Sequence, residues 1–424
     1  MAVLVVRGGQ RLEGEISVTG SKNSALALMV GAALGKGETI LENVPKYTDI
    51  PAQMAILRSL GVRVEEVESG CLLVDGTGLE NEQAPYELVR KLRASFYVAG
   101  LLLGRLGRAK VPFPGGDPFG TRPVDFHLRG FQALGADVNV EYGYMVARVG
   151  NLFGRLCGAK YYINRASFGT TVNLMLAACL ADGVTMLENA AREPEIVDLA
   201  MLLGKMGAKI KGAGTDMITI EGVRELRGTR HEVIPDRLET GTYMIGAAVT
   251  KGRVKVQNLM PEHVRALTIK LQEAGAEVRE SASALEISCC GRLRGVDVET
   301  RPYPGFATDY QAPFVALMTT AEGVSLVRES VFDDRFAYVD ELRRMGANIR
   351  IEGATAIVLG QAELTGAPVE TPDIRAGVAL VFAGLAAKGE TRIHGVHHLD
   401  RGYERIEEKL RKIGADIIRV EEEP

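Results

Sequence analysis

Five cations and one carboxylate stand at the starts of six apolar segments of this sequence. Each lies 14 to 18 residues before a glycine that ends a run rich in Ala, Leu and Met. The six are Lys22, Arg93, Arg165, Arg237, Asp309 and Arg375. A helix N-terminus already presents free N–H groups and a positive dipole end, so a cation there is unfavourable unless an anion binds. We therefore expect a site for an anionic substrate.

Further arginines are expected at the starts of a second set of helices, namely Arg122, Arg335 and Arg401. A purely structural role remains open for each cation. It could pair with a local carboxylate, such as Asp236 with Arg237 or Asp373 with Arg375. Repetition of the pattern favours a binding function.

One long Gly/Pro-rich segment, VPFPGGDPFGTRPVDFH at residues 111–127, lies outside any periodic pattern. Long loops of this kind in compact domains are usually lids or binding loops. The segment lacks the G-K-[ST] ending of a Walker A loop, which argues against a nucleotide kinase. Asp117 is a candidate functional residue in this loop, although it could simply cap a turn.

The elements that must position these residues repeat six times. A Gly-Ala-x-aliphatic signature, or a close variant of it, recurs at intervals of 68 to 74 residues. Its glycines are Gly61, Gly135, Gly207, Gly275, Gly346 and Gly414. Each repeat reads as a buried helix, a strand, a second helix and a hairpin, which we call a module. The glycine fits the left-handed position just after the second helix.

The sixth module lacks its last strand, and the first twelve residues resemble the hairpins of modules three and five. We therefore expect the N-terminus to close module six. Three modules per domain then predict an α/β protein of two domains. One spans residues 22–230 and contains the 111–127 loop, and the other is discontinuous, with residues 1–21 plus 231–424.

Composition argues for small-molecule chemistry in a cytoplasmic protein. The net charge of −4 arises from well-mixed signs, which gives no indication of nucleic acid or membrane partners. No stretch of eighteen apolar residues or secretory signal is found. The five cysteines show no metal-site or disulfide spacing. Histidines in HGVHHLD (394–400) are interpreted as surface residues rather than metal ligands, so no metal is expected.

Eight segments, in order from the first module to the last helix, carry a resemblance to a known family. They are SKNSALAL, LRAS, PGGDPFGTRPVDFHL, ENAAREPEI, DRLETGT, PGFATDYQ, DIRA and DRGYERIEEKL. Together they resemble UDP-N-acetylglucosamine 1-carboxyvinyltransferase. The resemblance implies a two-domain inside-out α/β barrel, the enolpyruvyl transferase fold, with six modules. It agrees with the repeats counted above.

The resemblance also implies an activity. The enolpyruvyl group of phosphoenolpyruvate would pass to the 3′-hydroxyl of UDP-N-acetylglucosamine by addition and elimination, with release of phosphate. This would be the first committed step of peptidoglycan synthesis, and so part of cell wall biogenesis, cell shape and cell division. No cofactor is implied, and the oligomeric state is left open.

Site residues follow by position in the family motifs. Lys22, Arg122 and Arg401 resemble the phosphoenolpyruvate ligands, with Arg93 and Arg375 nearby. A trianionic substrate needs such a clamp, because departure of phosphate and orientation of the carboxylate both depend on fixed positive charge.

The acceptor side is implied in the same way. Asp309 resembles the carboxylate that contacts the sugar hydroxyl as general base. Asn23 would meet the sugar, and Val331 the sugar region, with Asp333 beside it. The residues implied on the nucleotide side are Pro123, Asp125, Phe126, Arg165, Ser167, Phe168 and Gly169.

Three positions depart from the family pattern and leave the acceptor open. Asp117 stands where most members have Cys, Phe168 replaces a smaller apolar residue, and Asp333 replaces Glu. The family cysteine is attacked by the epoxide fosfomycin, so Asp117 predicts insensitivity to that drug. Asp117, Asp309, Lys22 and Arg401 are the expected catalytic residues.

Alternative functions stay open. A related enolpyruvyl transferase would act on shikimate 3-phosphate, and that family also begins with Gly-Ser-Lys, but it pairs the lysine with Ser where this chain has Asn23. Another nucleotide sugar or a non-catalytic binding paralogue is also possible on sequence alone.

Overall fold

The computed structural model describes residues 2–116, 124–150 and 154–422. These residues fold into two compact units. The inserted unit comprises residues 20–116 and 124–234, and the discontinuous unit comprises residues 2–19 and 235–422. The second crossing between units lies beyond residue 230, because the strand Arg230–Glu232 pairs with Glu38–Glu42 and so belongs to the inserted unit.

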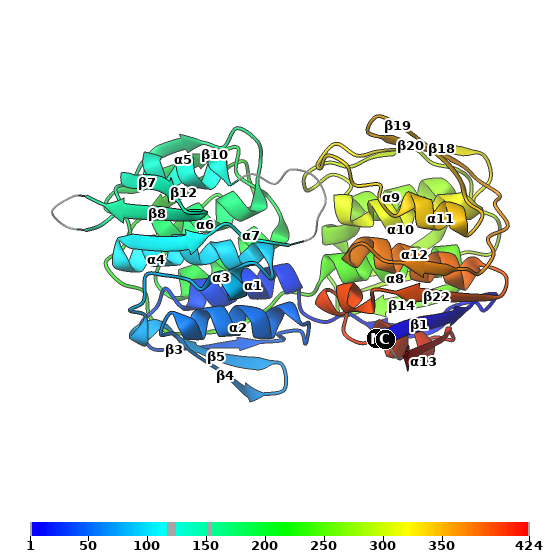
Figure 1. The fold of residues 1–424 in the computed structure, drawn as a ribbon, viewed down its shortest axis with the longest axis horizontal. Helices are drawn as coiled ribbons and strands as arrows, with labels where there is room; N and C mark the ends of the chain where they lie inside the picture. The colour runs from blue at the N-terminus through cyan, green and yellow to red at the C-terminus, as the bar shows by residue number, and fades with distance from the viewer. Residues whose placement is uncertain (1, 117–123, 151–153, 423–424) are drawn as a thin grey trace. The chain divides into compact units, whose positions relative to one another are not determined.

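Helices of the inserted unit lie inside it, with its sheets on the outside (Figure 1). The helices are α1 (Lys22–Ala32), α2 (Asp49–Ser59), α3 (Tyr86–Val89), α4 (Val98–Leu106), α5 (Asp125–Ala133), α6 (Phe168–Ala178) and α7 (Pro194–Lys205), with 3-10 turns η1 (Gly76–Gly78) and η2 (Arg93–Tyr97). The sheets, in order of pairing, are β13 (Arg230–Glu232), β3 (Glu38–Glu42), β5 (Cys71–Asp75), β4 (Arg63–Glu68); β6 (Arg108–Pro112), β8 (Tyr144–Val149), β7 (Ala136–Glu141); and β11 (Lys209–Lys211), β12 (Met217–Glu221), β10 (Val184–Glu188), β9 (Lys160–Tyr162).

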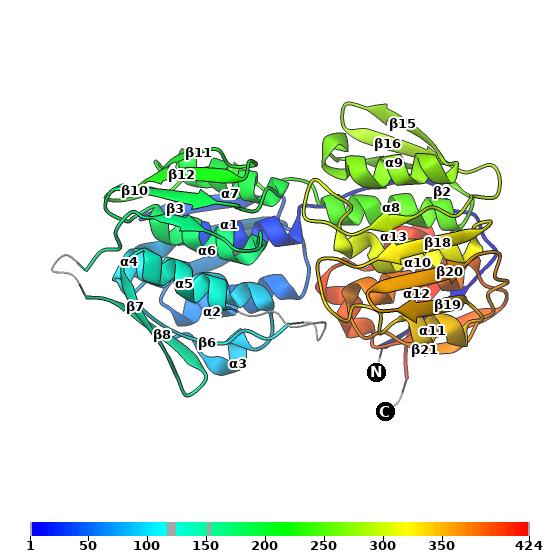
Figure 2. The same ribbon diagram turned by 90° about the horizontal axis from the view of Figure 1, so that it is seen from above.

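The discontinuous unit repeats this arrangement (Figure 2). Its helices are α8 (Arg237–Val249), α9 (Arg265–Ala274), α10 (Gln311–Thr320), α11 (Val339–Arg344), α12 (Ile374–Ala386) and α13 (Ile406–Lys412), with η3 (Pro261–Val264), η4 (Thr308–Tyr310) and η5 (Val396–Arg401). Its sheets are β15 (Glu277–Ser281), β16 (Ala284–Ser288), β14 (Arg253–Gln257), β2 (Glu13–Ser17); β17 (Val298–Glu299), β18 (Val324–Arg328), β20 (Thr355–Leu359), β19 (Asn348–Glu352); and β21 (Pro368–Glu370), β22 (Glu390–His394), β1 (Ala2–Arg7), β23 (Asp416–Glu421).

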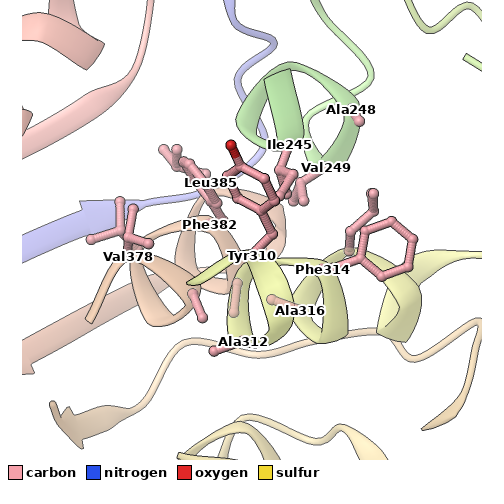
Figure 3. Close-up of a cluster of buried hydrophobic side chains, with 14 of the residues drawn as sticks. Ile245, Ala248, Val249, Tyr310, Ala312, Phe314, Ala316, Val378, Phe382 and Leu385 are labelled. Carbon is pink, nitrogen blue, oxygen red and sulfur yellow. The ribbon is translucent and has the colours of Figure 1, made fainter. Parts of the chain in front are cut away.

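The apolar runs form the innermost helices, as the sequence predicts. Every residue of α8 is buried, and α12 is buried from Ile374 to Leu385. Figure 3 shows side chains of α8, α10 and α12 meeting in one cluster, with Phe382 and Phe314 among them. A helix with apolar residues on all sides is stable only when other elements surround it.

In strands such as β14 and β22 every second residue is buried, so one face of the sheet covers the helices. The described strands form six separate sheets rather than one closed barrel of strands. Each sheet is built around the strands of one module, three in each unit, and β2 and β13 each pair with a module distant in sequence. The inside-out, six-module architecture is therefore confirmed, but without barrel closure among the described strands.

Local signals in the sequence mark the turn that follows the second helix of each module. All six signature glycines have positive φ, between 88° and 110°, which fits the turn after each second helix. The prediction for the N-terminus is also confirmed. Strand β1 lies between β22 and β23 and pairs antiparallel with both, so it supplies the missing strand of the sixth module.

Candidate active site

Asp309 and Arg375 form the centre of a charged cluster in the discontinuous unit. The Nε of Arg375 donates to Oδ1 of Asp309 at 2.9 Å, and Nη2 of Arg335 lies 3.8 Å from the same oxygen. Both arginine side chains are almost fully buried, whereas that of Asp309 is 30% exposed. Among the described residues none donates a hydrogen bond to Oδ2. One carboxylate oxygen is thus held and the other is left open.

The start of α12 explains the position of Arg375. Asp373 is the N-cap residue, and its Oδ1 accepts from the backbone N of Arg375 at 2.7 Å and of Ala376 at 3.0 Å. Its carboxylate caps the helix instead of pairing with the Arg375 guanidinium. The guanidinium turns to Asp309, so the alternative of a local ion pair between Asp373 and Arg375 is wrong.

Tyr403 fixes the other end of the Arg375 guanidinium. Nη1 of Arg375 donates to the Tyr403 hydroxyl at 2.7 Å, and that hydroxyl lies 2.8 Å from Oγ1 of Thr242. Thr242 already donates to the carbonyl of Leu238. Tyr403 therefore donates to Thr242 and accepts from Arg375, which orients Arg375 from two sides.

Arg335 is held by a chain of buried hydrogen bonds that begins at Glu329. Nη1 of Arg335 donates to Oγ1 of Thr308 at 2.6 Å, and Thr308 donates to Oε2 of Glu329 at 2.7 Å. Glu329 also accepts from the backbone N of Val331 at 2.8 Å. Glu329 therefore links the turn that carries Asp309 to the segment that carries Arg335.

The arginines control the charge of Asp309. Burial alone would raise the pKa of this carboxyl, but the charges of Arg375, Arg335 and Arg237 outweigh burial and hold the pKa well below its usual range. Asp309 is therefore ionised at neutral pH. Asp309 is therefore a weak base as long as no second anion lies near these arginines.

Lys22 and Asn23 lie in the inserted unit, at the first turn of α1. Nζ of Lys22 is 3.2 Å from Oδ2 of Asp49, the first residue of α2, and both side chains are about nine-tenths buried. The expectation of a local carboxylate partner thus holds for Lys22. Asn23 follows it, half-buried.

A third group of predicted residues gathers at three helix starts of the inserted unit. Arg93 is the first residue of η2, Asp125 and Phe126 begin α5, and Phe168 and Gly169 begin α6. The N-cap Ser167 accepts from the backbone N of Thr170 at 3.3 Å. The ring centroids of Phe168 and Tyr97 lie 6.4 Å apart.

The structure corrects the predicted helix starts of three arginines. Arg165 is exposed and precedes α6 by three residues, because Ser167 caps the helix. Arg335 precedes α11 by four residues. Arg401 ends η5 instead of beginning α13, because Arg405, with φ 45°, separates the two.

Val331 joins the Asp309 cluster through its backbone N, which donates to Oε1 of Glu329 at 2.8 Å. Val331 is half-buried beside Glu329, and Asp333 is exposed. Asp117, Arg122 and Pro123 lie outside the described residues. No set of three His, Cys, Asp or Glu residues within the described ranges could hold a metal ion, and Asp400 of the histidine segment instead pairs with Arg419 at 2.7 Å. None of the described helices is long and apolar enough to cross a membrane.

Comparison with known proteins decides the family. The model of the EPSP synthase family (3-phosphoshikimate 1-carboxyvinyltransferase) matches residues 6–410. The UDP-N-acetylglucosamine 1-carboxyvinyltransferase 2 of Symbiobacterium thermophilum is 54% identical over 420 residues, which cover 99% of this chain and 98% of that protein. The UDP-N-acetylglucosamine 1-carboxyvinyltransferase 1 of Caldanaerobacter subterraneus is 48% identical, over 98% of this chain and 99% of that protein. The chain belongs to the UDP-N-acetylglucosamine 1-carboxyvinyltransferase family.

Solved structures confirm the enolpyruvyl transferase fold. The enolpyruvyl transferase NikO from Streptomyces tendae has a TM-score of 0.87 at 23% identity, over 99% of this chain and 98% of that one. An EPSP synthase structure from Acinetobacter baumannii has a TM-score of 0.75 at 20% identity, over the full length of both chains. At these identities the likeness concerns the fold alone.

Several residues of the site were not anticipated from the family motifs. Asp49, Thr308, Glu329 and Tyr403 contact the expected cations or hold them in place. Tyr403 stands inside the motif DRGYERIEEKL, two residues after Arg401, without any pattern that marks its role. A polar residue inside a fully apolar helix is a usable signal, because a buried polar group must find a partner. Asn173 in α6 is such a residue.

Proposed function

We propose that this protein transfers the enolpyruvyl group of phosphoenolpyruvate to the 3′-hydroxyl of UDP-N-acetylglucosamine and releases phosphate. Membership of the family supports the reaction. The observation that carries the proposal is the asymmetric hold on Asp309, whose Oδ1 binds Arg375 while Oδ2 has no described donor. A general base needs one oxygen fixed and one open to the incoming hydroxyl.

The first step is addition. Oδ2 of Asp309 takes the proton of the sugar hydroxyl as the hydroxyl oxygen forms a bond to C2 of phosphoenolpyruvate. The methylene carbon C3 gains a proton at the same time, and we propose Asp117 as its donor. Because the substrate is trianionic, its charge near Arg375 opposes the effect of the arginines and raises the pKa of Asp309 toward its usual range.

The second step is elimination. The bond from C2 to the phosphate oxygen breaks, C3 loses a proton, and the vinyl ether forms. Fixed cations stabilise the leaving phosphate, because they are in place before charge develops. We assign this role to Lys22, Arg122 and Arg401, with Arg93 and Arg375 nearby.

The acceptor residues are proposed from the family positions. Asn23 and Val331 would contact the sugar, and a separate set of residues would bind the nucleotide. That set is Pro123, Asp125, Phe126, Arg165, Ser167, Phe168 and Gly169. Since both substrates are products of intracellular metabolism, we place the reaction in the cytoplasm, as an early step of peptidoglycan synthesis.

The experiment measures phosphate release from phosphoenolpyruvate with UDP-N-acetylglucosamine, and separately with shikimate 3-phosphate. We expect phosphate release with UDP-N-acetylglucosamine and none with shikimate 3-phosphate. Release only with shikimate 3-phosphate would overturn the acceptor, and binding of the sugar nucleotide without any release would favour a non-catalytic paralogue. The Asp309→Asn variant is the control for release that does not depend on the site.

A further inference from the structure

Asn173 is a fully buried amide in the middle of the apolar helix α6. Both ends of its side chain are bonded. Oδ1 accepts from the backbone N of Gly100 at 2.8 Å, and Nδ2 donates to the carbonyl of Phe96 at 3.0 Å. Nδ2 also lies 2.9 Å from Nδ1 of His127. A single side chain thus joins α6 to η2, α4 and α5.

The helices are built to approach closely at this point. A Cβ atom placed on Gly100 would lie 2.3 Å from the backbone oxygen of Asn173, so only glycine fits there. The contact between α4 and α6 therefore brings the Asn173 amide within reach of the backbone of Phe96 and Gly100. The other hydrogen of the amide is left for His127.

His127 is held neutral and in one tautomer. Burial, together with the charge of Arg93, lowers the pKa of His127 to about 3. Because an amide nitrogen can only donate, Nδ1 of the ring accepts from Asn173, and Nε2 carries the hydrogen. The Phe96 ring meets His127 edge-on, with centroids 5.2 Å apart.

The His127 ring also lies close to the start of α6. A Cβ on Gly169 would lie 3.4 Å from Cε1 and 3.7 Å from Nε2 of His127, which is ordinary contact distance. The pair therefore joins the three elements whose first residues were assigned to substrate binding. Arg93 begins η2, Asp125 begins α5, and Phe168 begins α6.

We propose that Asn173 and His127 act as positioning residues, which set the starts of α5 and α6 at the spacing that the nucleotide of the acceptor requires. The inference rests on the proposed function, because it takes the acceptor-binding residues from it. Neither residue is proposed to touch the reacting atoms. Misplacement of such a scaffold weakens substrate binding more than the chemical step.

The test compares two substitutions of His127. The His127→Phe variant keeps a ring against Phe96 and removes the acceptor of Asn173. The His127→Asn variant restores an acceptor close to the position of Nδ1. We expect His127→Phe to raise the KM for UDP-N-acetylglucosamine by about fivefold or more, with kcat and the KM for phosphoenolpyruvate within about twofold of wild type. The His127→Asn variant should recover most of the affinity.

A matched control separates positioning from stability. Val64 is buried in the sheet that contains β4, within the same unit and on a strand that carries none of the assigned residues. The Val64→Ala variant should lower Tm and leave the KM for the acceptor unchanged. Should His127→Phe fail to fold, His127→Leu removes the same hydrogen bond with a smaller side chain and is measured in its place.

Two results would overturn the inference. One is an unchanged acceptor KM in folded His127→Phe, and the other is a His127→Asn variant no better than His127→Phe. Failure of the proposed function looks different, since wild type would then release phosphate only with shikimate 3-phosphate. Shikimate 3-phosphate carries no nucleotide, so that result would remove the ligand the pair is proposed to serve, whatever the two His127 variants show.

Discussion

Arg375 reaches across 66 positions of sequence to bind only one of the two carboxylate oxygens of Asp309. The bond from Nε to Oδ1 fixes the carboxylate, and the guanidinium is itself fixed by the hydroxyl of Tyr403. Oδ2 accepts no hydrogen bond from any residue that the structure describes. This one-sided hold combines the rigidity that catalysis needs with an oxygen that can accept a proton.

Replacing Asp309 with Asn should abolish most turnover while both substrates still bind. The amide cannot take the hydroxyl proton, and loss of a general base typically costs about 10² to 10⁴ in rate. Single-turnover phosphate release gives the rate, and calorimetry gives the affinity for each substrate. Turnover close to wild type would exclude Asp309 as the base.

Removing the hydroxyl of Tyr403 should loosen Arg375. We expect Tyr403→Phe to cost about 1–3 kcal/mol of stability, because Arg375 and Thr242 both lose a buried partner. The KM for phosphoenolpyruvate should also rise. Tyr338→Phe is the matched control, since Tyr338 is equally buried and bonds Gln311 at 2.9 Å rather than a site arginine. Equal KM values for phosphoenolpyruvate in the two variants would argue against a role for Tyr403 in positioning Arg375.

Asp309 should make the free energy of unfolding depend on pH. Its pKa is lower in the folded protein than in the unfolded chain, where the pKa of Asp is about 3.9. The ion pair therefore contributes fully above the unfolded pKa, and this contribution falls as pH drops below it toward the folded value. Urea unfolding between pH 3 and pH 7 should show a shallower acid slope for Asp309→Asn than for wild type. Parallel slopes would contradict the assignment.

Fosfomycin should not inactivate the protein covalently. This prediction comes from the sequence, because Asp117 stands where most family members carry a cysteine and a carboxylate is a weaker nucleophile toward an epoxide. The Asp117→Cys variant should gain time-dependent inactivation, visible as an adduct in intact-mass spectra. An active Asp117→Cys variant without an adduct would show that residue 117 does not occupy the position of the family cysteine.

The sequence by itself determined the six modules, the central apolar helices and the family. These features depend on local signals, such as the positive φ at Gly135 or the apolar run before Gly389, which act within a few residues of chain. The same is true of the N-terminal strand, whose pattern matches the hairpins of other modules.

Only the tertiary structure decided the partner of each charge. Asp373 is two residues from Arg375, yet it caps the helix backbone and leaves the guanidinium to Asp309. Asn173 of α6 meets His127 of α5, 46 positions away in sequence, because folding packs these two helices together. A side chain takes the partner that folding places within about 3 Å of it, and separation along the chain says little about that distance.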